Sequence, residues 1–121
     1  MVSLSVVQQS NALIKTGRAI PRGIVGVFVG ATSGIGRACL VQFAQLTASP
    51  RIYFVGRSQQ AANEILQNLR QTNPEGKYTF IRADVSLLRN VDKVCEQIRA
   101  EEESVNVLFL SQGTLDVTTG M

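Results

Sequence analysis

A run of β-branched residues that ends in a glycine-rich turn places the strongest constraint on how this chain folds. Residues 24–29 read IVGVFV, a continuous apolar run typical of a parallel strand buried on both faces. Gly30, Gly34 and Gly36 follow directly, and apolar residues then recur at spacings of four and three, which predicts a helix over residues 34–47. The predicted apolar face of this helix consists of Ile35, Cys39, Phe43 and Leu46.

The alternation of strand and helix then continues along the chain. Residues 51–55, 78–82 and 105–110 have the composition of buried strands, and Pro50 and the NPEG turn at 73–76 end the preceding elements. Two further helices are predicted between these strands, and their apolar faces carry Ala62, Ile65, Leu66 and Leu69 in one and Val91, Val94, Cys95 and Ile98 in the other. The acidic run Glu101–Glu103 is expected to be a solvated face.

This alternation predicts the α/β class with a doubly wound parallel sheet. Right-handed crossovers place the helices after the first two strands on one face of the sheet and the third helix on the other. The fourth strand is then expected to be an exposed apolar edge, which can drive pairing with another chain. We expect residues 1–23 to form an N-terminal arm or short helix and residues 24–121 to form the partial Rossmann domain.

Composition narrows the possible functions. The chain has no histidine, which excludes His-based triads and His metal ligands, and no metal site is predicted. Its net charge of +3 comes from scattered basic residues, so no nucleic-acid partner is expected. We find no signal peptide and no apolar run long enough to span a bilayer, so no membrane partner is expected. Cys39 and Cys95 are interpreted as free buried thiols, which fits a reducing, cytoplasmic location.

The glycine loop carries the main functional signal. A glycine at the strand exit permits a tight turn, and one at the helix start lets the backbone approach a pyrophosphate, which the helix N-terminus attracts. The loop could also be only a tight connection between strand and helix. Its spacing and context together favour phosphate binding.

The loop, Val29-Gly30-Ala31-Thr32-Ser33-Gly34-Ile35-Gly36, resembles the first motif of the short-chain dehydrogenase/reductase family, T-G-x-x-x-G-I-G, with valine in place of the first threonine. The resemblance continues through Asp84-Val85, similar to the pair whose aspartate contacts the adenine amino group, and through Ser111-Gln112-Gly113, where the family has N-A-G. It covers almost all of residues 24–113 and has the character of fungal natural-product reductases. The resemblance implies a Rossmann-like doubly wound parallel sheet with strand order 3-2-1-4, truncated here after the fourth strand. The resemblance implies cofactor-binding roles for Gly30, Thr32, Ser33, Gly34, Ile35, Gly36, Asp84, Val85, Ser111 and Gly113.

The residues after the second strand predict which dinucleotide is preferred. A carboxylate there would bind both ribose hydroxyls and repel a 2′-phosphate, but this chain has Arg57-Ser58. Arg57 offers a guanidinium fork suited to phosphate, and Ser58 offers a hydroxyl. The alternative is a solvated loop arginine followed by a helix N-cap serine. We expect NADP to be preferred over NAD.

The catalytic residues that the resemblance implies, a serine and a Tyr-x-x-x-Lys pair, have no counterpart here. Tyr53 and Tyr78 are each followed four residues later by arginine, and both lie in predicted strands, so they are interpreted as sheet-packing aromatics and no catalytic residue is assigned. The favoured function is a truncated NADP-dependent oxidoreductase of secondary metabolism, inactive alone and partnered by a dinucleotide. Alternatives are one part of a split reductase with a complementing catalytic half, a non-catalytic interaction module or homo-oligomer, and a reductase with an unfamiliar site.

Overall fold

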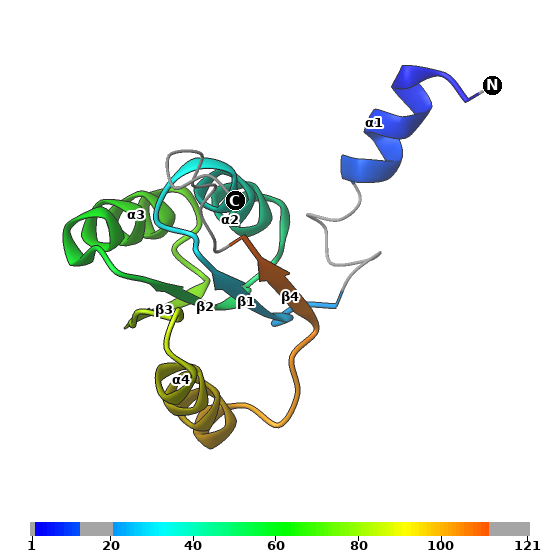
Figure 1. Cartoon of the computed structure of the whole chain (residues 1–121). Helices are drawn as coiled ribbons and strands as arrows, with labels where there is room; N and C mark the ends of the chain where they lie inside the picture. The colour runs from blue at the N-terminus through cyan, green and yellow to red at the C-terminus, as the bar shows by residue number, and fades with distance from the viewer. Residues whose placement is uncertain (1, 13–20, 112–121) are drawn as a thin grey trace, which may run out of the picture.

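Four parallel strands form the centre of the molecule. The computed structural model of the chain describes residues 2–12 and 21–111. In spatial order the strands are β3 (Lys77–Arg82), β2 (Arg51–Gly56), β1 (Val25–Val29) and β4 (Val107–Leu110) (Figure 1). The order β3-β2-β1-β4 and the parallel pairing confirm the predicted sheet.

The helices cover the two faces of the sheet unequally. Three helices follow strands, namely α2 (Gly34–Leu46), α3 (Gln59–Thr72) and α4 (Leu88–Glu101), and α1 (Leu4–Ala12) precedes the sheet. Figure 1 shows α2 and α3 on one face and α4 alone on the other, as right-handed crossovers require. Each face has its own core, one around Phe28, Phe54 and Leu40 and the other around Tyr53 and Val94.

The buried face of α2 differs from the predicted one. Ile35 and Leu46, expected to be inside, are 76% and 39% exposed, whereas Leu40 and Ala44 are completely buried. A side chain at Gly36 would meet the carbonyl oxygen of Gly30, so the helix approaches the glycine loop closely at this glycine. This close approach turns the stripe of Gly36, Leu40 and Ala44 inward and moves Ile35 to the outside.

The cysteines are both free thiols, as predicted, but they are not both buried. Cys39 is half-buried beside the α2 and α3 core, and Cys95 is exposed. The prediction for Cys95 was wrong because Val94 and Ile98 alone form the buried stripe of α4. The neighbouring position lies about 100° further round the helix.

The fourth strand is shorter than predicted and forms an exposed apolar edge. It begins at Val107 rather than Val105. Just before it, the side-chain oxygen of Asn106 accepts a hydrogen bond from the Val25 amide at 2.8 Å. Leu108 and Leu110 are 61% and 58% exposed, which confirms the expected apolar edge in the described part of the chain.

The end of α4 holds a polar network that the sequence did not predict. Glu101 and Glu102, expected to be solvated, both accept from the hydroxyl of Tyr53, at 2.8 and 2.7 Å. Glu102 also pairs with Arg51 at 2.5 Å, and its side chain is only 9% exposed. The network attaches the end of α4 to β2, so Tyr53 is both a sheet-packing residue, as predicted, and a hydrogen-bond donor.

Replacing Tyr53 by phenylalanine is expected to change how stability depends on pH. Burial first, and then the hydrogen bonds to Glu102 and Glu101, raise the pKa of Tyr53 above its usual value of 10.0. Above pH ~10 the unfolded chain therefore loses this proton while the folded chain keeps it, so stability falls as pH rises. Tyr53→Phe should lower the free energy of unfolding by about 1–3 kcal/mol at neutral pH and make its decline above pH ~10 shallower.

Urea unfolding of both proteins between pH 8 and pH 11 checks this prediction. Tyr78→Phe serves as the comparison, because burial also raises the pKa of Tyr78 while its hydroxyl donates to a backbone carbonyl, that of Asn73. Parallel pH profiles for wild type and Tyr53→Phe would contradict the network.

Candidate functional site

The glycine loop turns sharply where β1 ends. Gly30 has φ +79° and Gly34 has φ +60°, backbone conformations that residues other than glycine rarely adopt. The Gly30 amide donates to the carbonyl of Val55 at 2.9 Å, which joins the loop to the end of β2. The loop is therefore fixed against the neighbouring strand rather than free in solvent.

The N-terminus of α2 opens toward solvent. Its N-cap, Ser33, makes no side-chain capping hydrogen bond, and the first amides of a helix have no partner within the helix. A side chain built at Gly34 would meet nothing within 4 Å. As far as the described residues go, the open space and the first amides of α2 leave room for an anion to approach the positive end of the helix.

Most of the predicted site residues line one cleft at the carboxyl ends of the strands. Its volume is about 580 Å³. Ten predicted residues line it, namely Gly30, Thr32, Ser33, Gly34, Ile35, Gly36, Arg57, Asp84, Val85 and Ser111. Four further lining residues were not predicted: Val55, Gly56, Ala83 and Ser86. Because parallel strands β1, β2 and β3 all end here, the last residues of β2 could have been predicted from topology.

Two predicted site residues are not placed in the cleft. The hydroxyl of Ser58 accepts from the Ala61 amide at 3.1 Å, so this residue caps α3 as the alternative interpretation held, and it does not line the cleft. Gly113 lies outside the residues that the structure describes. Arg57 is exposed and lines the cleft, so it is available to a ligand.

Asp84 is held in an ionised, oriented state. Its Oδ1 accepts from the hydroxyl of Ser86 at 2.7 Å and from the Ser86 amide at 3.0 Å. These two bonds, with a smaller contribution from the positive charge of Arg57, lower the pKa of Asp84. In the described residues no donor bonds to Oδ2, which leaves that oxygen for a ligand amino group. An Asp-x-Ser turn pattern was the signal that could have identified Ser86.

Ser111 connects the glycine loop to β4. Its amide donates to the carbonyl of Val29 at 3.0 Å, and its hydroxyl donates to the carbonyl of Gly30 at 3.1 Å. Val29 stands where the family usually has threonine, so this loop lacks the threonine hydroxyl. The Ser111 hydroxyl, which follows β4, bonds to the backbone of the same loop. Thr32 has a similar packing role, since its methyl group fills the space beside Gly56.

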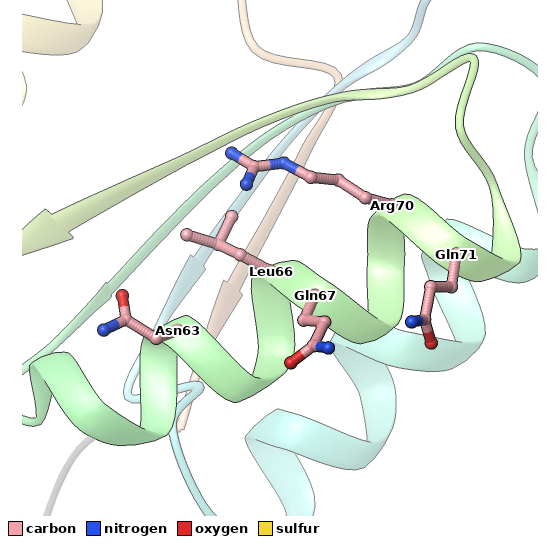
Figure 2. Close-up of a pocket in the computed structure, with 5 residues that line it drawn as sticks. All are labelled: Asn63, Leu66, Gln67, Arg70 and Gln71. Atoms are coloured by element: carbon pink, nitrogen blue, oxygen red, sulfur yellow. The ribbon is translucent and has the colours of Figure 1, made fainter.

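A separate hollow on the outer side of α3 lacks these features. Its volume is about 400 Å³, and Figure 2 shows that its lining residues all come from one helix: Asn63, Leu66, Gln67, Arg70 and Gln71. It has one charged side chain and no strand end or glycine loop. The cleft at the strand ends is therefore the better candidate.

Within residues 2–12 and 21–111, no group of three His, Cys, Asp or Glu side chains is placed to hold a metal ion. Nor does any helix in that part of the chain have the length and apolar character needed to cross a bilayer.

Sequence comparison finds a family and fungal relatives. Residues 25–119 match the family described as short chain dehydrogenase. Oxidoreductase AN1596 of Emericella nidulans is 45% identical over 117 residues, which cover 97% of this chain and 34% of that protein. Oxidoreductase andH of Emericella variicolor is 41% identical, over 94% of this chain and 33% of that protein. The chain thus spans about a third of the length of these relatives.

Structural comparison supports the same fold. L-sorbose reductase from Gluconobacter frateurii, solved with NADPH and L-sorbose, superimposes with a TM-score of 0.68. The sequences are 24% identical, and the match covers 83% of this chain and 38% of the reductase. At this identity the likeness establishes a shared Rossmann-type fold.

Proposed function

This chain belongs to the short-chain dehydrogenase family, and we propose that it binds NADP(H) at the cleft as the cofactor-binding part of an oxidoreductase. The observation that carries the proposal is the convergence on one cleft of a glycine loop, an uncapped helix N-terminus, Arg57 and Asp84. The structural neighbour solved with NADPH supports a nicotinamide dinucleotide. The open space beside Gly34, at the start of α2, supports the approach of its pyrophosphate.

Each part of the cleft has a role in this proposal. The amides of Gly34, Ile35 and Gly36 bind the pyrophosphate, and Oδ2 of Asp84 accepts from the adenine amino group. Arg57 binds the 2′-phosphate, since no carboxylate stands at the end of β2 to exclude it. When bound, the nicotinamide supplies or accepts a hydride, which is the chemistry that this family's name implies.

These 121 residues are not expected to catalyse hydride transfer alone. No tyrosine in the sequence is followed four residues later by lysine, and the general acid that such a pair provides contributes roughly 10²- to 10⁴-fold in rate. The proposed whole activity is therefore that of an NADP-dependent oxidoreductase. Residues other than these 121 would bind the substrate and donate the proton. A place in fungal secondary metabolism and a cytoplasmic location belong to the same proposal.

Calorimetric titration with NADPH tests the binding function. We expect saturable binding of one NADPH per chain, displaced by adenosine 2′,5′-bisphosphate but not by nicotinamide mononucleotide, because the described cleft contacts the adenosine and pyrophosphate end. A parallel assay of NADPH absorbance with carbonyl compounds should give no turnover. Failure to bind NADPH would refute the proposed function.

The edge of the sheet supports a second candidate function, that of an interaction module. Among the described residues, β4 pairs with β1 alone, and exposed apolar side chains lie along its other edge: Val107, Leu108 and Leu110. A second copy of the chain or a complementing catalytic half could pair there. Size-exclusion chromatography with light scattering separates the candidates, because a pure interaction module associates without binding NADPH.

A further inference from the structure

A second hollow adjoins the candidate cleft and carries a strong positive charge. Its volume is about 630 Å³, and it lies between the end of β3 and one flank of α4. It shares Arg57, Ala83 and Asp84 with the cleft, so the two spaces meet at the proposed adenosine end. Its other lining residues are Ile81, Arg82, Asn90, Lys93, Val94 and Gln97.

The cations of this hollow are not neutralised by neighbouring acids. Arg57, Arg82 and Lys93 line it with a single carboxylate, Asp84, whose Oδ1 is already bonded by Ser86. In the described residues, the ion pairs involve other basic side chains, those of Arg22, Arg37 and Arg51. A net positive hollow beside a nucleotide cleft favours a ligand with an additional anionic group.

Lys93 is the cation that the helix directs toward this space. Asn90, Lys93, Val94 and Gln97 follow a helical spacing of three and four, and all four line the hollow. Buried Val94 packs in the same core as Ile81 of β3, which fixes the rotation of α4. Arg82 directly follows Ile81 at the end of β3 and also lines the hollow, so Lys93 is the cation that comes from the helix.

A hydrogen bond holds this flank of α4 against the proposed adenosine site. The Asn90 side-chain amide donates to the backbone carbonyl of Asp84 at 2.9 Å. Asn90 stands one helical turn before Lys93, so the bond fixes the position of the lysine relative to Asp84 and Arg57. The long side chain of Lys93 can then reach past Ala83 and Asp84, which line both the hollow and the cleft.

We propose that Lys93 completes the 2′-phosphate subsite with Arg57 and is a specificity-determining residue for NADP. This proposal rests on the proposed NADP(H) function. Its physical basis is charge: a 2′-phosphate carries about −1.5 to −2 at pH 7, more than the single charge of Arg57 can balance. Two cations from opposite sides, one on the β2 loop and one on α4, match that charge.

The test compares adenosine 2′,5′-bisphosphate, adenosine 3′,5′-bisphosphate and AMP by calorimetry on the whole chain. Lys93→Gln should weaken binding of the 2′,5′-bisphosphate about three- to tenfold and change AMP binding less than about twofold. Lys93→Arg should restore most of the loss, and the difference should shrink at high salt. Arg89→Gln is the matched control, since it removes a charge from the same helix outside the hollow.

The remaining outcomes distinguish this proposal from the one on which it rests. If the wild type binds the 2′,5′-bisphosphate and Lys93→Gln binds it with the same affinity, the role of Lys93 is overturned. The NADP(H) function then still stands. Equal losses for Lys93→Gln and Arg89→Gln, or for the 2′ and 3′ isomers, would reduce the effect to general charge and also overturn it. A wild-type chain that binds none of the three nucleotides refutes both proposals.

Discussion

Gly36→Ala is expected to lower the free energy of unfolding by about 1–3 kcal/mol and to weaken NADPH binding about 100-fold. The added methyl group would overlap the carbonyl oxygen of Gly30 and the hydroxyl of Ser111. The carbonyl belongs to the loop backbone and cannot rotate away as a flexible side chain would. The helix or the loop must move, and the amides that we assign to the pyrophosphate move with it.

Urea unfolding and NADPH titration of the same preparation measure both effects, with Gly34→Val as the contrast. A Cβ atom at Gly34 meets no described atom within 4 Å, so valine there costs mainly backbone strain at φ +60°. It should abolish binding by occupying the cleft while far-UV circular dichroism stays unchanged. Gly23→Val controls for strain alone, because Gly23 has φ +77° and lies away from the cleft. Wild-type stability and affinity in Gly36→Ala would contradict the described packing.

The sequence predicted the architecture well because its signals are local and periodic. Each strand is a short β-branched or aromatic run, and each connection is short. The strand order followed from the resemblance to the family, and the handedness of crossovers then decides the faces on which the helices lie. The cleft followed from the same rule. Residues at the carboxyl ends of parallel strands meet, so the glycine loop, Arg57 and Asp84 came together although 54 positions separate Gly30 from Asp84.

The errors arose where a pair of distant residues decides the outcome. Helical spacing alone allowed Ile35 inside α2, and only the contact between Gly36 and the Gly30 carbonyl sets the rotation of the helix. A run of three glutamates is usually solvated, yet Glu102 is buried because Arg51 and Tyr53 of a distant strand bind it. No periodicity in the sequence encodes such pairs, so they required the structure.

Arg57→Ala is expected to remove most of the preference for NADP over NAD. A charge-assisted phosphate contact contributes about 1.5–3 kcal/mol, so NADP affinity should fall roughly 10- to 150-fold. NAD affinity should change less than about twofold, because the remaining cleft residues bind parts that both dinucleotides share. Arg70→Ala is the control, since this exposed arginine lines the separate hollow on α3. Equal wild-type affinities for NADP and NAD would refute the role of Arg57.

The pH dependence of this selectivity identifies the group that Arg57 binds. Hydrogen bonds from Ser86 lower the pKa of Asp84, so this carboxylate takes up no proton between pH 8 and pH 5. The 2′-phosphate, with a second pKa of about 6, takes up a proton in that range. Wild-type preference for NADP should therefore decline as pH falls through about 6 while NAD affinity stays constant. In Arg57→Ala the decline should be much smaller, and an unchanged decline would place the phosphate against another cation.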